Sequence, residues 1–350
     1  MKLGDRFYNI LTIALIILGL SFFAAFTIYY DPMFHYHAPF DGMSYVLELD
    51  EERYISSGIA KNFDYDSIIC GSSVNENFKT TQFDKLFNAK SIKVPLSGGY
   101  MKEVASILDA GFKTHKNIKY VLRSLDTFFL LDVKTEENPD AIDVKYLVND
   151  NIFDDVYYLF NFDTFIGKTL RNRTLTKNKA SSTTFDDYAN WSKSVTYGAV
   201  PYDAKELNTV PPQLDLFDYE VETIKKNIEN NILRIVREHR DTQFLLYYVP
   251  YSVIYYLTMR QTYSLKRFFD CEKMAFDMLV DEPNVKLYGF SLDFDRACNI
   301  SNYKDSAHYG DWVNEKILDD ISKYKNRITR SNSDFYFKKI YDFYYNYRIK

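Results

Sequence analysis

Two short segments, far apart in the chain, contain the residue types needed for nucleophilic catalysis. Gly71-Ser72-Ser73 follows the apolar run 67–70 and precedes a helical pattern. Asp305 and His308 lie three residues apart near the other end of the chain. A carboxylate that orients an imidazole allows the imidazole to deprotonate a serine hydroxyl, and the hydroxyl oxygen can then attack a carbonyl carbon. The spacing therefore predicts Ser73 as nucleophile, His308 as base and Asp305 as the group that orients it.

Each signal alone has a simpler explanation. Gly-Ser-Ser between a strand and a helix is usually a helix cap, and a single histidine carries little information. Both segments, however, follow an expected strand of a parallel sheet, and the ligand crevice of such a sheet lies beyond the carboxyl ends of its strands. The two signals therefore reinforce each other. At the start of the following helix, the backbone N–H of Ser73 could also stabilise an oxyanion.

The elements that must position these residues alternate between strand and helix. Short buried-strand patterns occupy residues 67–70, 91–94, 120–125, 243–249 and 285–290. Helical patterns occupy residues 77–87, 100–115, 219–240, 257–279 and 311–324. This alternation predicts an α/β fold with a five-stranded parallel sheet in a flavodoxin-like, three-layer α/β/α arrangement.

We expect this α/β domain to span residues 64–330, with a long insertion at about 132–218. The insertion is rich in Asp, Asn, Tyr and Thr and contains Trp191. It is too long for a simple crossover, and long insertions often lie over a functional site. This segment either contacts substrate or forms a purely structural cap, and the sequence favours neither.

The N-terminus predicts a membrane anchor. The 24 residues from Phe7 to Tyr30 carry no charge, and as a helix they would span more than the roughly 30 Å of a hydrocarbon core. Lys2 and Arg6 precede this stretch, which favours a cytosolic N-terminus and an extracytoplasmic domain. A cleaved signal peptide is the alternative, but its apolar region is normally only about 7–15 residues long. We therefore expect an uncleaved single-pass anchor over residues 1–30.

Two further segments flank the domain. Residues 31–63 are expected to form a stalk with a strand that leads into the domain. Residues 331–350 are dense in aromatic and basic residues and predict a helix, which either packs on the domain or lies against lipid headgroups.

Composition excludes several classes of protein. With 43 Lys+Arg against 48 Asp+Glu, the chain has no overall positive field, and nucleic acid is not an expected partner. The three cysteines form no metal-ligand pattern, although one Cys271–Cys298 bridge is conceivable. His35 and His37 could face one metal ion, but no carboxylate pair accompanies them, so a structural role is expected. Neither a metal nor any other cofactor is expected.

With these residues in view, the chain resembles the SGNH or GDSL hydrolase superfamily. That family combines a Gly-x-Ser block after the first strand with an Asp-x-x-His block near the end, and the resemblance covers roughly residues 64–325. It implies that Ser73 is the nucleophile, His308 the base and Asp305 its partner.

The resemblance also implies an oxyanion hole, with one departure from the family pattern. Leu96-Ser97-Gly98-Gly99 looks like the family block whose glycine amide binds the oxyanion, which points to Gly98 or Gly99. The third family block supplies an Asn side chain, but this chain has Asp126 there. An ionised carboxylate cannot donate a hydrogen bond, so Asn75 is the substitute donor that we consider.

Gly-Ser-Ser together with an N-terminal anchor is similar to the membrane-tethered branch of this superfamily, which includes the D-alanylation protein of lipoteichoic acid synthesis. The resemblance implies a serine esterase or O-acyltransferase that acts on acylated cell-envelope or capsular glycan, with a multi-pass membrane acyltransferase as a further partner. The alternative is a catalytically inactive member that binds glycan or scaffolds an envelope assembly, since Tyr and Trp faces near Trp191 suit sugar rings.

Overall fold

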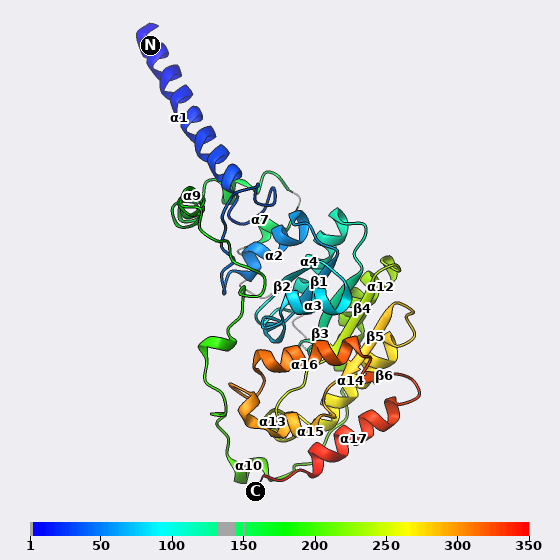
Figure 1. Ribbon diagram of the computed structural model, residues 1–350. Helices are drawn as coiled ribbons and strands as arrows, with labels where there is room; N and C mark the ends of the chain where they lie inside the picture. The colour runs from blue at the N-terminus through cyan, green and yellow to red at the C-terminus, as the bar shows by residue number, and fades with distance from the viewer. Residues whose placement is uncertain (1–2, 132–143, 150, 350) are drawn as a thin grey trace.

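The computed structural model describes residues 3–131, 144–149 and 151–349. The fold is α/β, with one mixed β-sheet at its centre and helices around it (Figure 1). The sheet has six strands in the order β2-β1-β3-β4-β5-β6. The first five are parallel, whereas β6 pairs antiparallel with β5. The expectation of five strands was therefore wrong by one, because a two-residue strand leaves no hydropathy run. The strands are β1 (Ser67–Gly71), β2 (Ser91–Pro95), β3 (Tyr120–Leu125), β4 (Gln243–Tyr248), β5 (Val285–Gly289) and β6 (Arg327–Ile328).

Two groups of helices cover opposite faces of the sheet. Ile69 of β1 is paired with Lys93 of β2, and the next residue, Cys70, is paired with Arg123 of β3. Successive residues of a strand point to opposite faces of the sheet, so the side chains of Lys93 and Arg123 also point to opposite faces. Lys93 reaches backbone carbonyls just before α3 (Thr80–Phe87), and α3 contacts α16 (Asp311–Ser322). Arg123 instead donates to carbonyls on the side of α4 (Met101–Thr114). Both faces are thus covered, which explains the unbroken apolar runs of the strands.

The remaining large helices lie on the α4 side or beside it. The pattern at 219–240 forms α11 (Asp218–Ile228), a π-helical segment η4 (Glu229–Leu233) and α12 (Arg234–Glu238). The pattern at 257–279 is not one helix but two, α13 (Val253–Thr262) and α14 (Leu265–Leu279). The chain turns at Ser264, which has φ +118° and accepts the Arg267 N–H in its side chain as the cap of α14.

Residues 31–63 are folded onto the domain, and they contain no strand in the structure. The prediction of a stalk with a leading strand was therefore wrong. Instead, α2 (Glu52–Asn62) buries Ile55 and Ile59 and contacts both β2 and α4. A side chain at Gly58 would collide with the backbone carbonyls of Met33 and Phe34, so glycine permits this close approach.

The chain begins and ends in helices of different character. Helix α1 (Leu3–Tyr30) projects away from the domain (Figure 1), and its Arg6–Tyr30 part is long and apolar enough to cross a membrane. Helix α17 (Ser333–Asn346) packs on the domain with Tyr336, Phe337, Ile340 and Tyr344 buried. Arg260 fixes its end by donating to the carbonyls of residues 344, 345 and 347.

The described part of the insertion, 144–149 and 151–218, contains short helices and no strand. Its first half lies near the base of α1, and it then runs back along the domain toward α10 (Figure 1). Residues 132–143, where the expected insertion begins, lie outside the described residues, as does Lys2. The helices of the described insertion are α7 (Lys145–Val148), α8 (Val156–Leu159), the π-helical η2 (Thr164–Thr169), α9 (Leu170–Lys177), the 3-10 helix η3 (Ser192–Ser194) and α10 (Ala204–Leu207).

All three cysteines are free thiols. Cys271 is buried on α14, whereas Cys298 ends α15 (Phe294–Cys298), so the conceivable Cys271–Cys298 bridge is not formed.

Candidate active site

The structure brings together the three residues that the sequence singles out for nucleophilic catalysis. Ser73 Oγ lies 2.7 Å from His308 Nε2. On the other side of the ring, His308 Nδ1 lies 2.8 Å and 3.0 Å from the two carboxylate oxygens of Asp305. This serine–imidazole–carboxylate chain has the contacts that an activated serine requires.

Ser73 is placed by a sharp change of direction at the end of β1. Gly71 has φ +137°, a conformation that L-residues with side chains rarely adopt. A side chain at this position would also collide with the side chains of Asn75 and Ser124. The 3-10 helix η1 (Ser73–Asn75) starts two residues after Gly71, so Ser73 stands at the carboxyl edge of the sheet.

The loop before α16 holds Asp305 and His308 in a tight turn. One oxygen of Asp305 accepts the backbone N–H groups of Ala307 and His308, at 2.9 and 2.8 Å. The carbonyl of Ser306 accepts both the N–H and the hydroxyl of Ser252. The loop is therefore fixed both to itself and to the segment that follows β4.

The hydrogen bonds in this turn determine the charge of Asp305. Burial would raise its pKa, but the hydrogen bond from the His308 ring, the charge of that ring and the two backbone N–H donors together lower the pKa to about 2. The side chains of His308 and Asp305 are 27% and 45% exposed, so the site is open to solvent. Asp305 is consequently an ionised partner for the ring at every pH near neutrality.

The expected oxyanion donors lie in three different environments. The N–H of Gly99 donates to the carbonyl of Leu96 at 2.9 Å, so this amide is occupied and does not serve as the expected donor. Gly98 is exposed with φ +59°. The side chain of Asn75 is fully buried against Gly71, and neither its nitrogen nor its oxygen has a hydrogen-bond partner among the described residues.

Asp126 is an acceptor within a buried network. Its carboxylate accepts the hydroxyls of Tyr251 at 2.7 Å and Ser72 at 3.2 Å, and the N–H of Phe128 at 3.3 Å. Burial raises its pKa, while these hydrogen bonds and the nearby His308 ring act in the opposite direction. The carboxyl group thus orders the chain after β3 next to Ser72, directly before the candidate nucleophile.

The insertion contributes Trp191 to the site, but this side chain is buried and offers no exposed aromatic face. The side chain is 5% exposed, and its ring meets the His308 ring edge to face with centroids 5.7 Å apart. The ammonium group of Lys304 lies 4.0 Å from the Trp191 ring centroid. Trp191 therefore supports the His308 ring, and its faces are not free for a sugar ring.

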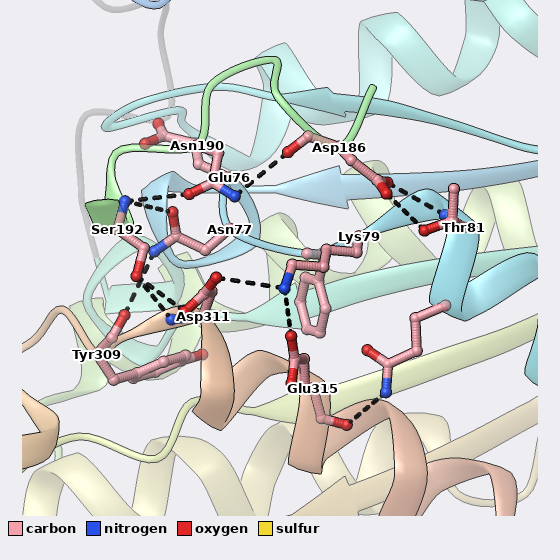
Figure 2. Close-up of polar contacts among 12 residues, drawn as sticks. Glu76, Asn77, Lys79, Thr81, Asp186, Asn190, Ser192, Tyr309, Asp311 and Glu315 are labelled. Atoms are coloured by element: carbon pink, nitrogen blue, oxygen red, sulfur yellow. Dashed lines mark hydrogen bonds and ion pairs between the residues drawn. The ribbon is translucent and has the colours of Figure 1, made fainter. Parts of the chain in front are cut away.

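A set of polar contacts ties the insertion to α3 and to the start of α16 (Figure 2). We call residues 186–192 the strap. At one end of the strap, Asp186 accepts from the hydroxyls of Thr80 and Thr81 and from the Thr81 N–H. At the other end, the hydroxyl of Ser192 donates to the carboxylate of Asp311. The same hydroxyl oxygen accepts the backbone N–H of Asp311.

The strap network reaches the loop of His308 through Asn77. The Asn77 side chain accepts the Ser192 N–H and donates to the carbonyl of Tyr309, the residue after His308 (Figure 2). Lys79 adds ion pairs to Asp311 and Glu315. No sequence pattern pointed to Asn77, Ser192 or Asp311, because their contacts join segments more than 100 residues apart.

The two N-terminal histidines have partners within the protein. His35 Nε2 lies 3.1 Å from Asp155, and the two ring nitrogens of His37 face the carbonyls of Ala38 and Ile28. Among the described residues, no group of three or more His, Cys, Asp or Glu side chains is arranged to hold a metal ion.

Comparisons with known proteins leave the family open. No family model and no curated protein matches the chain. One solved structure, described as "a putative platelet activating factor from Streptococcus pneumonia", is similar over 79% of this chain and 91% of that chain, with 11% sequence identity and a TM-score of 0.41.

Proposed function

We propose that this protein is a membrane-anchored serine esterase or O-acyltransferase of the SGNH type. The observation that carries the proposal is the hydrogen-bonded chain from Ser73 through His308 to Asp305. The order of the parallel strands, β2-β1-β3-β4-β5, is that of a flavodoxin-like doubly wound sheet and supports the assignment. Ser73 stands at the carboxyl edge of this sheet, which is where such folds bind ligands.

The proposed reaction has two steps. His308 Nε2 takes the hydroxyl proton of Ser73 while Ser73 Oγ bonds to the carbonyl carbon of an ester, and the resulting imidazolium stays paired with Asp305. The tetrahedral intermediate then expels the alcohol, which receives that proton from His308 and leaves an acyl-serine. In the second step, water or a glycan hydroxyl attacks the acyl group with His308 again as base, and Ser73 regains its proton.

Oxyanion stabilisation falls to backbone N–H groups in this proposal. Asp126 accepts hydrogen bonds and the Gly99 amide is occupied, so neither donates. The amide of Ser73, at the start of η1, and the exposed Gly98 are the donors that we propose. Loss of one such donor costs about a hundred-fold or more in rate in serine hydrolases, so a hole with fewer donors predicts slow turnover.

For the substrate, we propose acylated cell-envelope or capsular glycan. An anchor at α1 would hold the domain close to the membrane surface, and the exposed site can accept a polymer better than a closed pocket could. A cytosolic N-terminus would put the domain outside the cell, where these glycans are found. A multi-pass membrane acyltransferase is the partner that we propose for a transfer reaction.

A catalytically inactive, glycan-binding scaffold was the alternative from the sequence. It depended on Asp126 replacing a donor and on an aromatic surface around Trp191. Because Trp191 is buried beneath Lys304 and against His308, that surface does not exist at this residue. The catalytic proposal is therefore the one that the geometry favours.

Turnover by the full-length protein in detergent tests this proposal. We expect hydrolysis of p-nitrophenyl acetate and release of acetate from an O-acetylated oligosaccharide, both abolished by Ser73→Ala without a change in the unfolding midpoint. Ser106→Ala is the matched control, since Ser106 is exposed on α4 and its hydroxyl bonds only within that helix. Activity retained in Ser73→Ala would contradict the proposal.

A further inference from the structure

An exposed apolar surface lies at the base of α1. Within residues 152–166, the large apolar side chains that face solvent include Phe153, which is 81% exposed, and Phe162, which is 68% exposed. Outside α1, these are the two largest exposed fractions among the aromatic side chains that the structure describes. We call this surface the apolar platform; its exposed members are Ile152, Phe153, Val156, Tyr157, Phe160, Phe162 and Ile166.

These residues come from a short run of turns and helices that precedes α9. Residues 152–155 form turns that lead into the one-turn helix α8 (Val156–Leu159), and the exposed fraction of each side chain places these residues at the surface. Phe162 and Ile166 continue this series of exposed apolar side chains into the π-helical η2. A soluble surface rarely gathers so many apolar side chains, and a patch of this kind marks a contact with a partner or with a membrane.

Direct contacts join the platform to the proposed membrane helix. The Phe165 ring stacks on Phe23 of α1 with centroids 4.0 Å apart, and Phe160 stacks on the same ring at 6.3 Å. Phe26 also meets Phe165, at 5.7 Å. The platform and α1 therefore form one continuous apolar surface.

A buried hydrogen bond fixes this junction. Tyr158, on the inner side of α8, donates to the carboxylate of Asp31 at 2.6 Å, directly after the end of α1. The same carboxylate accepts the N–H groups of residues 35, 36 and 37. Movement of α8 away from α1 would break these contacts, so the platform keeps its depth relative to α1.

The length of α1 sets that depth. A hydrocarbon core takes about 20 helical residues, and the apolar part of α1 covers 25 residues, Arg6–Tyr30. Every window of about 20 residues within this stretch contains Phe23, wherever the helix is placed along the membrane normal. Phe165 and Phe160, which stack on Phe23, must then lie at the level of the hydrocarbon or at its edge.

We propose that the apolar platform is a monotopic membrane-binding surface that inserts into the outer interface of the bilayer crossed by α1. This inference rests on the anchoring that we propose above. Phe and Tyr side chains are suited to this interface, as in other proteins that lie in the plane of a membrane. Lipid is the occupant, rather than a second protein, because the platform shares its level with α1, whose side chains are exposed along most of the helix.

Charged groups around the platform are compatible with this placement. Asp154 bonds to Asn149, and Asp155 bonds to His35 and Tyr36, so both carboxylates are held by the protein. Asp163 is exposed. On the next helix, α9, Arg173 and Lys177 are exposed, where they can meet lipid phosphates.

Insertion would orient the domain as well as hold it. A single helix followed by a flexible linker allows the domain to tilt freely, whereas a second contact beside the helix restricts that tilt. The site at Ser73 would then stay at a fixed height above the membrane, which favours a substrate that is itself attached to the membrane surface.

Quenching of a fluorophore in full-length protein, reconstituted in phosphatidylcholine–phosphatidylglycerol vesicles, tests the proposal. An environment-sensitive dye is attached to Phe153→Cys or Phe162→Cys in a Cys298→Ser background, since Cys70 and Cys271 are buried. Quenchers are a lipid nitroxide near the headgroup, a lipid nitroxide deep in the acyl chains, and aqueous iodide.

Two control positions separate the platform from the anchor. Leu18→Cys reports on the middle of α1, and Phe335→Cys reports on α17, at the opposite end of the molecule (Figure 1). We expect quenching at 153 and 162 by the shallow nitroxide, several-fold stronger than by iodide, together with quenching at 18 by the deep nitroxide. Position 335 should respond to iodide alone.

Three results would overturn the proposal. If position 18 is quenched by lipid while 153 and 162 behave like 335, the anchor holds and the platform does not insert. If 153 and 162 are shielded from lipid and iodide alike, a protein covers the platform. If position 18 responds only to iodide, the proposed anchoring itself fails, and the platform proposal fails with it.

Discussion

At the scale of single residues, Asp305 determines the direction in which His308 can act. Its carboxylate lies on the Nδ1 side of the ring, so Nδ1 carries the proton in the neutral imidazole and Nε2 is left to accept the proton of Ser73. Hydrogen bonds from the ring and from two backbone N–H groups outweigh the effect of burial and bring the pKa of Asp305 to about 2. The carboxylate is therefore charged whenever the ring must become an imidazolium.

Replacing this carboxylate by an amide should remove most of the catalytic advantage. We expect Asp305→Asn to lower kcat on the order of a thousand-fold or more, because the amide permits the wrong tautomer of His308 and does not stabilise the imidazolium. The titration of Asp305 itself should contribute no inflection to the wild-type pH–rate profile between about pH 5 and pH 9, since a group with a pKa of about 2 does not titrate in that range. Steady-state kinetics across this range check the prediction. Asp319→Asn is the control, since Asp319 is a partly exposed carboxylate near the end of α16 that pairs with Lys323. A wild-type kcat in Asp305→Asn would contradict the prediction.

The residue types, the expected strand ends and the family resemblance together predicted roles for Ser73, His308 and Asp305, and the structure shows the contacts that these roles require. The same signals were not sufficient for the oxyanion hole. Whether the Gly99 amide is free depends on a local turn that closes onto Leu96, and the burial of Asn75 depends on the absence of a side chain at Gly71. Both properties arise from backbone geometry that a list of residue types does not contain.

At the scale of secondary-structure elements, helix α14 buries an ionisable side chain, that of Glu272, in its core-facing surface. Glu272 has 0% exposure and accepts the hydroxyl of Thr127 at 2.8 Å with one oxygen, while its other oxygen has no partner among the described residues. Burial raises the pKa of Glu272 to about 8. The folded protein thus holds a proton on Glu272 that the unfolded chain releases above its ordinary pKa of 4.5.

This difference predicts that stability depends on pH. The contribution of protonated Glu272 is fully present below pH 4.5 and is lost as pH rises through 8. Glu272→Gln removes the titration, so the variant should gain stability relative to wild type between pH 5 and pH 8.5, on the order of a few kcal/mol. Urea unfolding at the two pH values measures the difference. Exposed Glu222→Gln should show none, and an equal pH dependence in Glu272→Gln and wild type would refute the account.

The sequence predicted strands better than helices. The five expected strands agree with β1 to β5 to within one residue at each end, because strands covered on both faces appear as short apolar runs. Helix interruptions could not be predicted in this way. The apolar spacing continues across the turn at Ser264, so the pattern does not show that the helix is interrupted there. In α2, Ile55 and Ile59 lie among small polar residues, so no apolar stripe marks this helix.

At the scale of the whole molecule, the strap connects parts of the chain that sequence patterns treat separately. Residues 186–192 contact α3, which follows Ser73, and the start of α16, which follows His308 (Figure 2). The strap therefore fixes the distance between nucleophile and base from outside the sheet. Contacts of this kind join three separate segments, and no periodicity within any one of them predicts the contact.

Loosening the strap should weaken catalysis without touching a catalytic residue. Asp186→Ala removes the acceptor for Thr80 and Thr81, which should cost about 1–3 kcal/mol in stability and increase deuterium exchange across residues 183–195. Because the base is then held less firmly, we expect kcat to fall several-fold. Asp187→Ala is the control, since that carboxylate bonds to Thr184 in the same segment. Unchanged exchange in Asp186→Ala would show that the strap is held by other contacts.

The central claim is that Ser73 is an activated nucleophile, and covalent labelling of the full-length protein with a fluorophosphonate tests it most directly. We predict a single adduct, located at Ser73 by mass spectrometry, that is lost in His308→Ala and retained in Ser106→Ala. The absence of any adduct on folded protein, or labelling that does not depend on His308, would contradict the account.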